Sequence, residues 1–212
     1  MTSRRRRLHA FLIWAALAAV MAVPVLIAAM SPYLAYRNAA YIIGGFAGIT
    51  ALALLVLQPL LAAGYLPVAN ILTGRRWHRW TGAVIAVCVA LHVGGLYVTS
   101  PPDTLDALLL AAPTPFSVYG VLAMWGIVVT VILVILRRRS GLAHATWRIV
   151  HNALAAVVVV ATVIHALQIE GAMETISKWV LCLAALAATA AALTGLRVIR
   201  PLLRRRRKTA SQ

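Results

Sequence analysis

The sequence predicts an all-α integral membrane protein, a bundle of six transmembrane helices with both termini in the cytoplasm. Three observations predict it. The 212 residues are 63% hydrophobic and only 11% charged, whereas a soluble domain carries about 25% charged residues. Apolar runs long enough to cross lipid, roughly 17–25 residues, recur along the whole chain. The basic residues gather in alternate gaps between these runs, as they do on the cytoplasmic side of membrane proteins.

The apolar runs leave no stretch for a soluble domain, so we expect a single domain over residues 1–212. The expected spans are approximately residues 8–30, 41–63, 80–99, 116–136, 148–169 and 178–199. The expected loops between them are residues 31–38, 64–79, 100–115, 137–147 and 170–177, and residues 200–212 form a basic tail. The first run follows a basic start, as in a signal peptide, but is longer than an h-region of about 7–15 residues. We therefore interpret it as a retained span, bent at Pro24.

The charges predict the orientation. Eighteen of the 20 Lys and Arg lie at the two termini and around the second and fourth loops. Only Arg37 and Lys178 lie on the opposite side, together with all four acidic residues. An even number of spans puts both termini on one side, so the count and the positive-inside rule agree. Anchoring at membrane lipid explains the net charge of +16, and we expect no nucleic-acid binding. We expect a multi-pass protein of the bacterial inner (plasma) membrane.

Two histidine pairs stand out in the apolar runs. His78 and His92 lie in the third span, and His151 and His165 lie in the fifth, with thirteen residues between the members of each pair. A step of fourteen is close to four helical turns, so both imidazoles of a span point to one side, about 21 Å apart along the axis. Ionisable residues inside a membrane are costly and indicate function, and imidazole is a regular axial ligand of haem. Two such helices side by side would hold two haems, each iron between two imidazoles.

The predicted topology places the four histidines at two depths, with one histidine of each span at each depth. The third and fifth spans run in the same direction, so His78 and His151 are expected near the cytoplasmic face. The other two histidines are expected near the outer face. His144, seven residues before His151, is an alternative ligand in its place.

Residues near the histidines allow two interpretations each. Gly82 and Gly95 lie about one turn after a histidine on the same face, where glycine would leave room for a macrocycle or allow close helix packing. Arg79 and Arg148 are candidate contacts for haem propionates, because Arg suits carboxylates, although anchoring on the cytoplasmic side explains most arginines at this level. Trp147 is expected in the inner aromatic belt with Trp77 and Trp80.

The two cysteines, Cys88 and Cys182, lie in apolar runs and no CxxCH motif is present. We expect them to be buried and free, without covalent haem attachment.

At the histidine pairs the sequence resembles the ferric-reductase-like transmembrane domain superfamily. It includes ferric reductases, NADPH oxidases and the haem-binding membrane subunit of the periplasmic methionine-sulfoxide reductase. The resemblance covers roughly the second to sixth spans. It implies a six-helix bundle that binds haem b and transfers electrons across the membrane. It also implies an inner haem, on His78 with His151, and an outer haem, on His92 with His165, with at least one of the two bound.

The chain lacks the GxGxxG fingerprint of a dinucleotide-binding domain after a strand. We therefore expect a separate electron donor, either a flavoprotein with FMN or FAD or a quinone. The acceptor stays open between ferric iron, oxygen, a quinone and a partner protein. We expect an oxidoreductase electron-transfer subunit without catalytic residues of its own.

Three alternatives remain. The first is a one-haem membrane subunit that delivers quinone or flavin electrons to a periplasmic reductase, and the presence of His78 points instead to a two-haem member. The second is a non-haem metal or proton transporter that uses the four histidines. No Asp or Glu lies within an expected span, and ion pathways usually need them. The third is a structural anchor for a partner, which is compatible with electron transfer.

Overall fold

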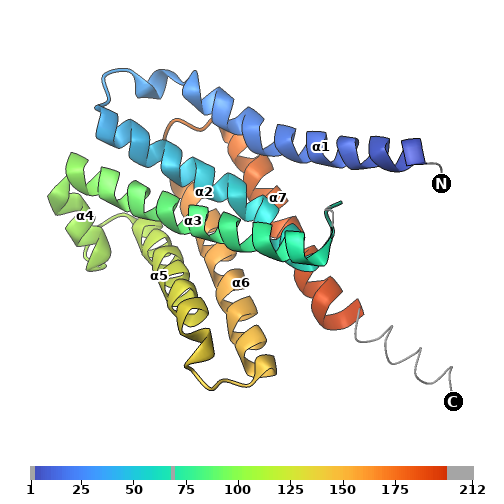
Figure 1. Ribbon diagram of the computed structural model, residues 1–212. Coiled ribbons are helices and arrows are strands. Elements are labelled where there is room, and N and C mark those ends of the chain that lie inside the picture. The colour runs from blue at the N-terminus through green and yellow to red at the C-terminus, as the bar shows by residue number, and fades with distance from the viewer. Residues whose placement is uncertain (1–2, 68–69, 200–212) are drawn as a thin grey trace, which may run out of the picture.

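The computed structural model describes residues 3–67 and 70–199, and the regular secondary structure of this part of the chain is all helical (Figure 1). Its α-helices are α1 (Ser3–Ala29), α2 (Ala39–Ala63), α3 (Ile71–Thr99), α4 (Pro101–Leu108), α5 (Pro115–Ile135), α6 (His144–Gln168) and α7 (Thr175–Thr194). Six of them, all except α4, are long and apolar enough to cross a membrane. The predicted helical membrane bundle is therefore confirmed, and the chain is a multi-pass membrane protein. Its orientation stays a prediction.

Helix α3 begins earlier than predicted. Residues 71–79 were expected in a loop, but they form the first turns of α3. Asn70 caps this helix, and its side-chain oxygen accepts a hydrogen bond of 2.8 Å from the backbone N–H of Thr73. His78 therefore lies inside a helix rather than at its entry. In the same way α6 begins at His144, four residues before the predicted start of the fifth span.

The predicted loop over residues 100–115 contains the short helix α4. Two prolines open this helix, where a missing N–H costs nothing, and the hydroxyl of Ser100 donates to Asp103 at 2.6 Å. The predicted sixth span also differs, because α7 ends at Thr194 and continues as a π-helix, Gly195–Ile199. The predicted basic tail, residues 200–212, lies outside the described residues.

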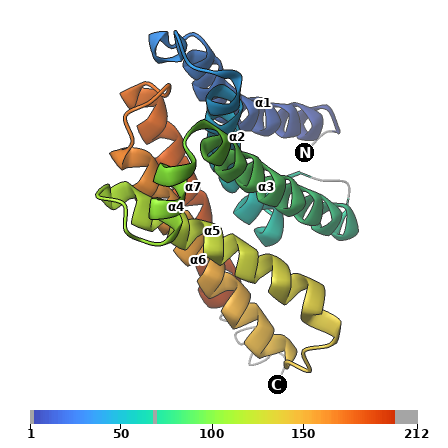
Figure 2. The ribbon, with the colours of Figure 1, turned by 90° about the vertical axis from the view of Figure 1, so that its left-hand side faces the viewer.

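The helices pack as two antiparallel pairs joined by α7. Helix α2 packs on α3, α5 packs on α6, and α7 contacts both α2 and α6 (Figures 1 and 2). Helix α1 lies on the outside against α2 and α7. In Figure 1 the start of α3 and the turn between α5 and α6 lie toward one end of the bundle, and α4 lies at the other. The two pairs bring α3 and α6 to face one another across the bundle.

Small residues let α2 and α3 approach closely. A Cβ added at Gly95 would lie 2.6 Å from the carbonyl oxygen of Ala40 and 2.8 Å from the Cα of Gly44. A Cβ at Gly82 would lie 2.9 Å from the side-chain nitrogen of Gln58. Gly95 thus serves close helix packing, one of the two interpretations drawn from the sequence, whereas Gly82 meets only the end of the Gln58 side chain.

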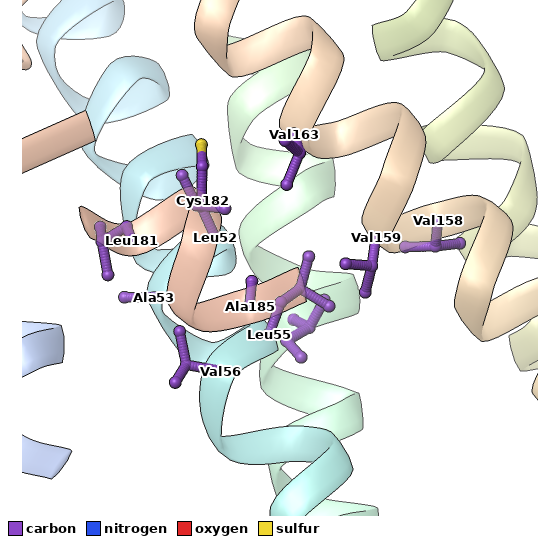
Figure 3. Close-up of a cluster of buried hydrophobic side chains, with 11 residues drawn as sticks. Leu52, Ala53, Leu55, Val56, Val158, Val159, Val163, Leu181, Cys182 and Ala185 are labelled. Atoms are coloured by element: carbon purple, nitrogen blue, oxygen red, sulfur yellow. The ribbon is translucent and has the colours of Figure 1, made fainter. Parts of the chain in front are cut away.

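The apolar core lies where α2, α6 and α7 meet (Figure 3). Leu181 and Cys182 of α7 are fully buried there against a cluster that includes Leu52 of α2 and Val159 of α6. Cys182 and Cys88 are both buried and free, as predicted. This core holds α6 against α2. Because α3 packs on α2, the core also sets the position of α3 relative to α6, and these two helices carry the histidines.

Candidate functional site

The four histidines meet as two pairs across the bundle. The ring centroids of His78 and His151 are 6.3 Å apart, with an angle of 78° between the ring planes. Those of His92 and His165 are also 6.3 Å apart, at 79°. Two imidazoles on opposite sides of one first-row metal ion, with metal–nitrogen bonds of about 2 Å and ring radii of about 1.2 Å, would have centroids about 6.4 Å apart. The centroid distance within each pair matches that of two rings on opposite sides of one metal ion.

Three of the four rings are anchored through Nδ1 to a backbone carbonyl of a neighbouring helix. The bonds are His78 to Gln58 at 3.2 Å, His92 to Gly44 at 2.8 Å and His165 to Phe116 at 2.8 Å. A carbonyl oxygen only accepts, so each of these Nδ1 atoms carries the hydrogen and donates it. The Nε2 lone pair is then free to bind a metal, and the hydrogen bond fixes the tautomer and orients the ring.

The carbonyls that accept these bonds repeat with the step of the histidines. Gly44 and Gln58 are fourteen residues apart on α2, as are the two histidines on α3. Because α2 and α3 are antiparallel, one step along each helix leads from one pair to the other. His151 departs from this arrangement. Its buried Nδ1 has no hydrogen-bond partner among the described residues, and its ring stacks on Trp147 at a centroid distance of 5.0 Å.

Two glycines lie directly beneath histidine rings. A Cβ added at Gly48 would lie 2.9 Å from Nδ1 of His92, and one at Gly120 would lie 2.7 Å from Nδ1 of His165. Each glycine is four residues after the carbonyl that accepts the bond, so it lies one turn further along the same helix face. The sequence alone did not indicate them, because they lie on helices opposite the histidines. Only glycine leaves room for the ring at this distance from the neighbouring helix.

A cavity of about 850 Å³ lies beside His92 and His165. This volume is in the range of cofactor pockets, about 300–1,000 Å³. Its walls are mainly apolar side chains of α2, α3, α5 and α6. Gly45 also lines it, and a Cβ added there would meet no atom within 4 Å. The cavity thus offers an apolar space beside the paired imidazoles.

Two basic residues also line this cavity, Arg37 and Lys178. They are the two basic residues that the charge pattern of the sequence places on the side opposite to the other 18. The Arg37 guanidinium lies 4.7 Å from the ring centroid of Tyr41, and Lys178 Nζ donates to the carbonyl oxygen of Ile169. Their place on the chain marks them as unusual, but only the fold brings them to one cavity. Three acidic residues, Asp103, Asp106 and Glu170, line the same cavity, so its lining carries charges of both signs, and the two cations are the groups in it that suit carboxylates.

The other predicted residues lie outside the two pairs. Arg79 and Arg148 are exposed, and their contact with propionates stays a prediction. Arg197 of the π-helix donates to the carbonyl oxygen of Arg148 at 2.6 Å. His144 bonds Arg137 at 2.8 Å and stacks on Trp147, so it is His151 that faces His78. Among residues 3–67 and 70–199, no group of three or more His, Cys, Asp and Glu is placed to hold a metal ion.

Fold and site together define a class, a helical membrane bundle with two stacked histidine pairs. Residues 47–162 match the family model described as "Ferric reductase like transmembrane component". This match spans more than half of the chain, so the protein belongs to that family. The matched segment contains three of the four paired histidines and ends before His165. No curated protein and no solved structure matches the chain. Domains of this family typically bind haem, and membership indicates electron transfer across the membrane.

Proposed function

We propose that this protein binds two b-type haems and transfers electrons across the membrane, from a donor on the cytoplasmic side to an acceptor on the outer side. One observation carries the proposal. The same two helices bring imidazoles to a centroid distance of 6.3 Å at two levels, fourteen residues apart. One such pair alone would carry little weight. Two with equal spacing and nearly equal ring angles favour a repeated cofactor site.

A pair of imidazoles suits haem better than a bare metal ion. The macrocycle supplies four nitrogens to its iron, so two axial side chains complete six-coordination. Bare zinc in a structural site takes four protein ligands, and each level of the bundle offers two. The transporter alternative therefore explains the paired geometry less well.

Bound haem would supply a one-electron couple between ferric and ferrous iron. His78 with His151 and His92 with His165 would provide the axial nitrogens. Apolar side chains around the second pair would exclude water. Arg37 and Lys178 would pair with propionates at that level, in competition with the three carboxylates of the same lining. We place this level on the outer side by the charge rule.

His78 favours two haems over one. In a one-haem subunit that serves a periplasmic reductase, the His78–His151 pair would hold no haem and would need no oriented ring. Nδ1 of His78 instead bonds the Gln58 carbonyl, as the histidines of the other pair bond theirs. The donor is expected to be a flavoprotein with FMN or FAD, or a quinone. A periplasmic reductase remains a candidate acceptor alongside ferric iron, oxygen and quinone.

Proteoliposomes test this function. The haem-loaded protein is reconstituted with ferricyanide trapped inside, dithionite is added outside, and loss of the ferricyanide absorbance is followed. The unaltered protein should accelerate this loss far above that of empty liposomes. His78→Ala and His92→Ala should each return the rate to background. His9→Ala, which removes a histidine outside both pairs, is the matched control. Full haem content and full transfer in both paired variants would contradict the proposal, and a colourless preparation with bound zinc would favour a transporter.

A further inference from the structure

One of the four paired histidines is held differently from the others. The carbonyl that accepts from His165 belongs to Phe116 of α5. One step of fourteen residues along α5 leads from Phe116 to Thr130, which is where the repeat would place an acceptor for His151. The structure has no such bond. Nδ1 of His151 is buried and unpartnered among the described residues.

Trp147 takes up the space beside this ring. It lies four residues before His151 on α6, and the two rings are stacked at 5.0 Å with only 6° between their planes. The indole is in turn contacted by one residue of α6 and one residue that precedes α6 in the chain. The Arg137 guanidinium lies 4.6 Å from the indole centroid, and the His144 ring stacks on it at 6.4 Å and 17°. A large planar side chain fixed in this way restricts rotation of the ring beside it.

We propose that Trp147 is the positioning residue of His151, doing by stacking what a backbone hydrogen bond does for the other three histidines. This inference rests on the proposed haem-binding function. A hydrogen bond donated by the second ring nitrogen makes an imidazole a more basic ligand and fixes its orientation. His151 lacks that bond, so its axial bond is the weakest of the four. Removing Trp147 therefore frees the iron of the His78–His151 pair first.

The test uses full-length protein, loaded with haem and purified in detergent, with the Trp147→Leu and Trp147→Phe variants. Carbon monoxide is added to the dithionite-reduced protein, and the visible spectrum is recorded. An iron with two imidazoles has no free position for carbon monoxide, so the spectral change counts irons that have lost an axial ligand. The unaltered protein should show no change. Trp147→Leu should bind carbon monoxide at one of its two haems, and Trp147→Phe, which keeps an aromatic ring for stacking, should behave as the unaltered protein does.

Trp80→Leu is the matched control. Trp80 lies two residues from His78 with its side chain 64% exposed on the outside of the bundle, and its loss should leave carbon monoxide binding absent. Two fully low-spin haems in Trp147→Leu would overturn the inference. So would carbon monoxide binding at both of its haems, or equal binding in the Trp80 control.

A second measurement needs no variant. In the unaltered oxidised protein, increasing cyanide should displace an axial ligand from one haem before the other. Displacement from both at the same concentration would overturn the inference. Failure of the proposed function is distinguishable from failure of this inference, because it shows as unaltered protein without two haems.

Discussion

Gly120 is the position at which one added methyl group acts most directly on a paired histidine. In Gly120→Ala the new Cβ would lie 2.7 Å from both Nδ1 and Cε1 of His165. An ordinary contact begins at 3.4 Å, so the ring must move by roughly 0.7 Å. That exceeds the tolerance of about 0.5 Å within which a preorganised site keeps its geometry. The same movement strains the 2.8 Å hydrogen bond from His165 to the Phe116 carbonyl.

The expected cost follows from these two contacts. Overpacking of a close-packed interior costs about 1–3 kcal/mol, and loss of a hydrogen bond costs about 0.5–1.5 kcal/mol. A combined loss of about 2 kcal/mol at the site weakens haem affinity about 30-fold, because 1.4 kcal/mol corresponds to a factor of ten. Gly120→Ala should therefore lose the haem of the His92–His165 pair and keep the other.

The assay is the pyridine haemochrome determination of haem per chain after purification with limiting haem. Gly94→Ala is the control, because a Cβ at Gly94 would meet no atom within 4 Å and the residue lies two positions from His92. It should retain both haems. Full haem content in Gly120→Ala, with an unchanged low-spin spectrum, would refute the assignment of His165 as an axial ligand in the observed ring position.

Three further predictions follow from the same geometry. His78→Ala should remove one haem and His92→Ala the other, so that the double variant binds none; haem content measures this, and full content in each single variant would contradict it. The ring planes within each pair are 78° and 79° apart, and near-perpendicular imidazoles leave two iron d orbitals close in energy. The oxidised protein should therefore give highly anisotropic low-spin electron paramagnetic resonance signals, whereas signals typical of parallel rings would show that the rings turn when haem binds. Glu174 caps α7 by accepting from the backbone N–H groups of Ile176 and Ser177, and these hydrogen bonds hold the pKa of its carboxyl below the usual 4.5. The stability it contributes is complete above that pH and is lost as the pH falls through the lowered pKa. Thermal unfolding in detergent should thus depend less on acid in Glu174→Gln than in the unaltered protein, and equal dependence would mean that the cap adds nothing measurable.

The six spans and the histidine pairs could be predicted because each depends on a property local to one helix. Hydropathy over about twenty residues indicates a span, and the helical period puts residues fourteen apart on one face. The ends of the helices were harder to place. Helix α3 begins at Ile71, directly after its Asn70 cap, although polar residues follow. Helix α4 forms within a stretch that its prolines suggested was a loop.

The supports of the histidine rings could not be predicted. Gly48 and Gly120 act on rings carried by other helices, so their role depends on how each helix is rotated about its axis. Helices that are apolar all round carry no sequence signal for that rotation. Trp147 was expected in the inner aromatic belt, and that placement stays a prediction. Its stacking on His151 fits the four-residue spacing on one helix face, whereas the missing partner of the His151 ring nitrogen shows only in the packing.

The haem content of the purified protein tests the central claim most directly. The oxidised and dithionite-reduced visible spectra, with a pyridine haemochrome assay, give the type and number of haems per chain. We predict two b-type haems per chain, both low-spin in each oxidation state. A single haem would contradict the double-site account and leave one histidine pair without a cofactor. A colourless protein that takes up no haem on reconstitution would contradict the electron-transfer function altogether.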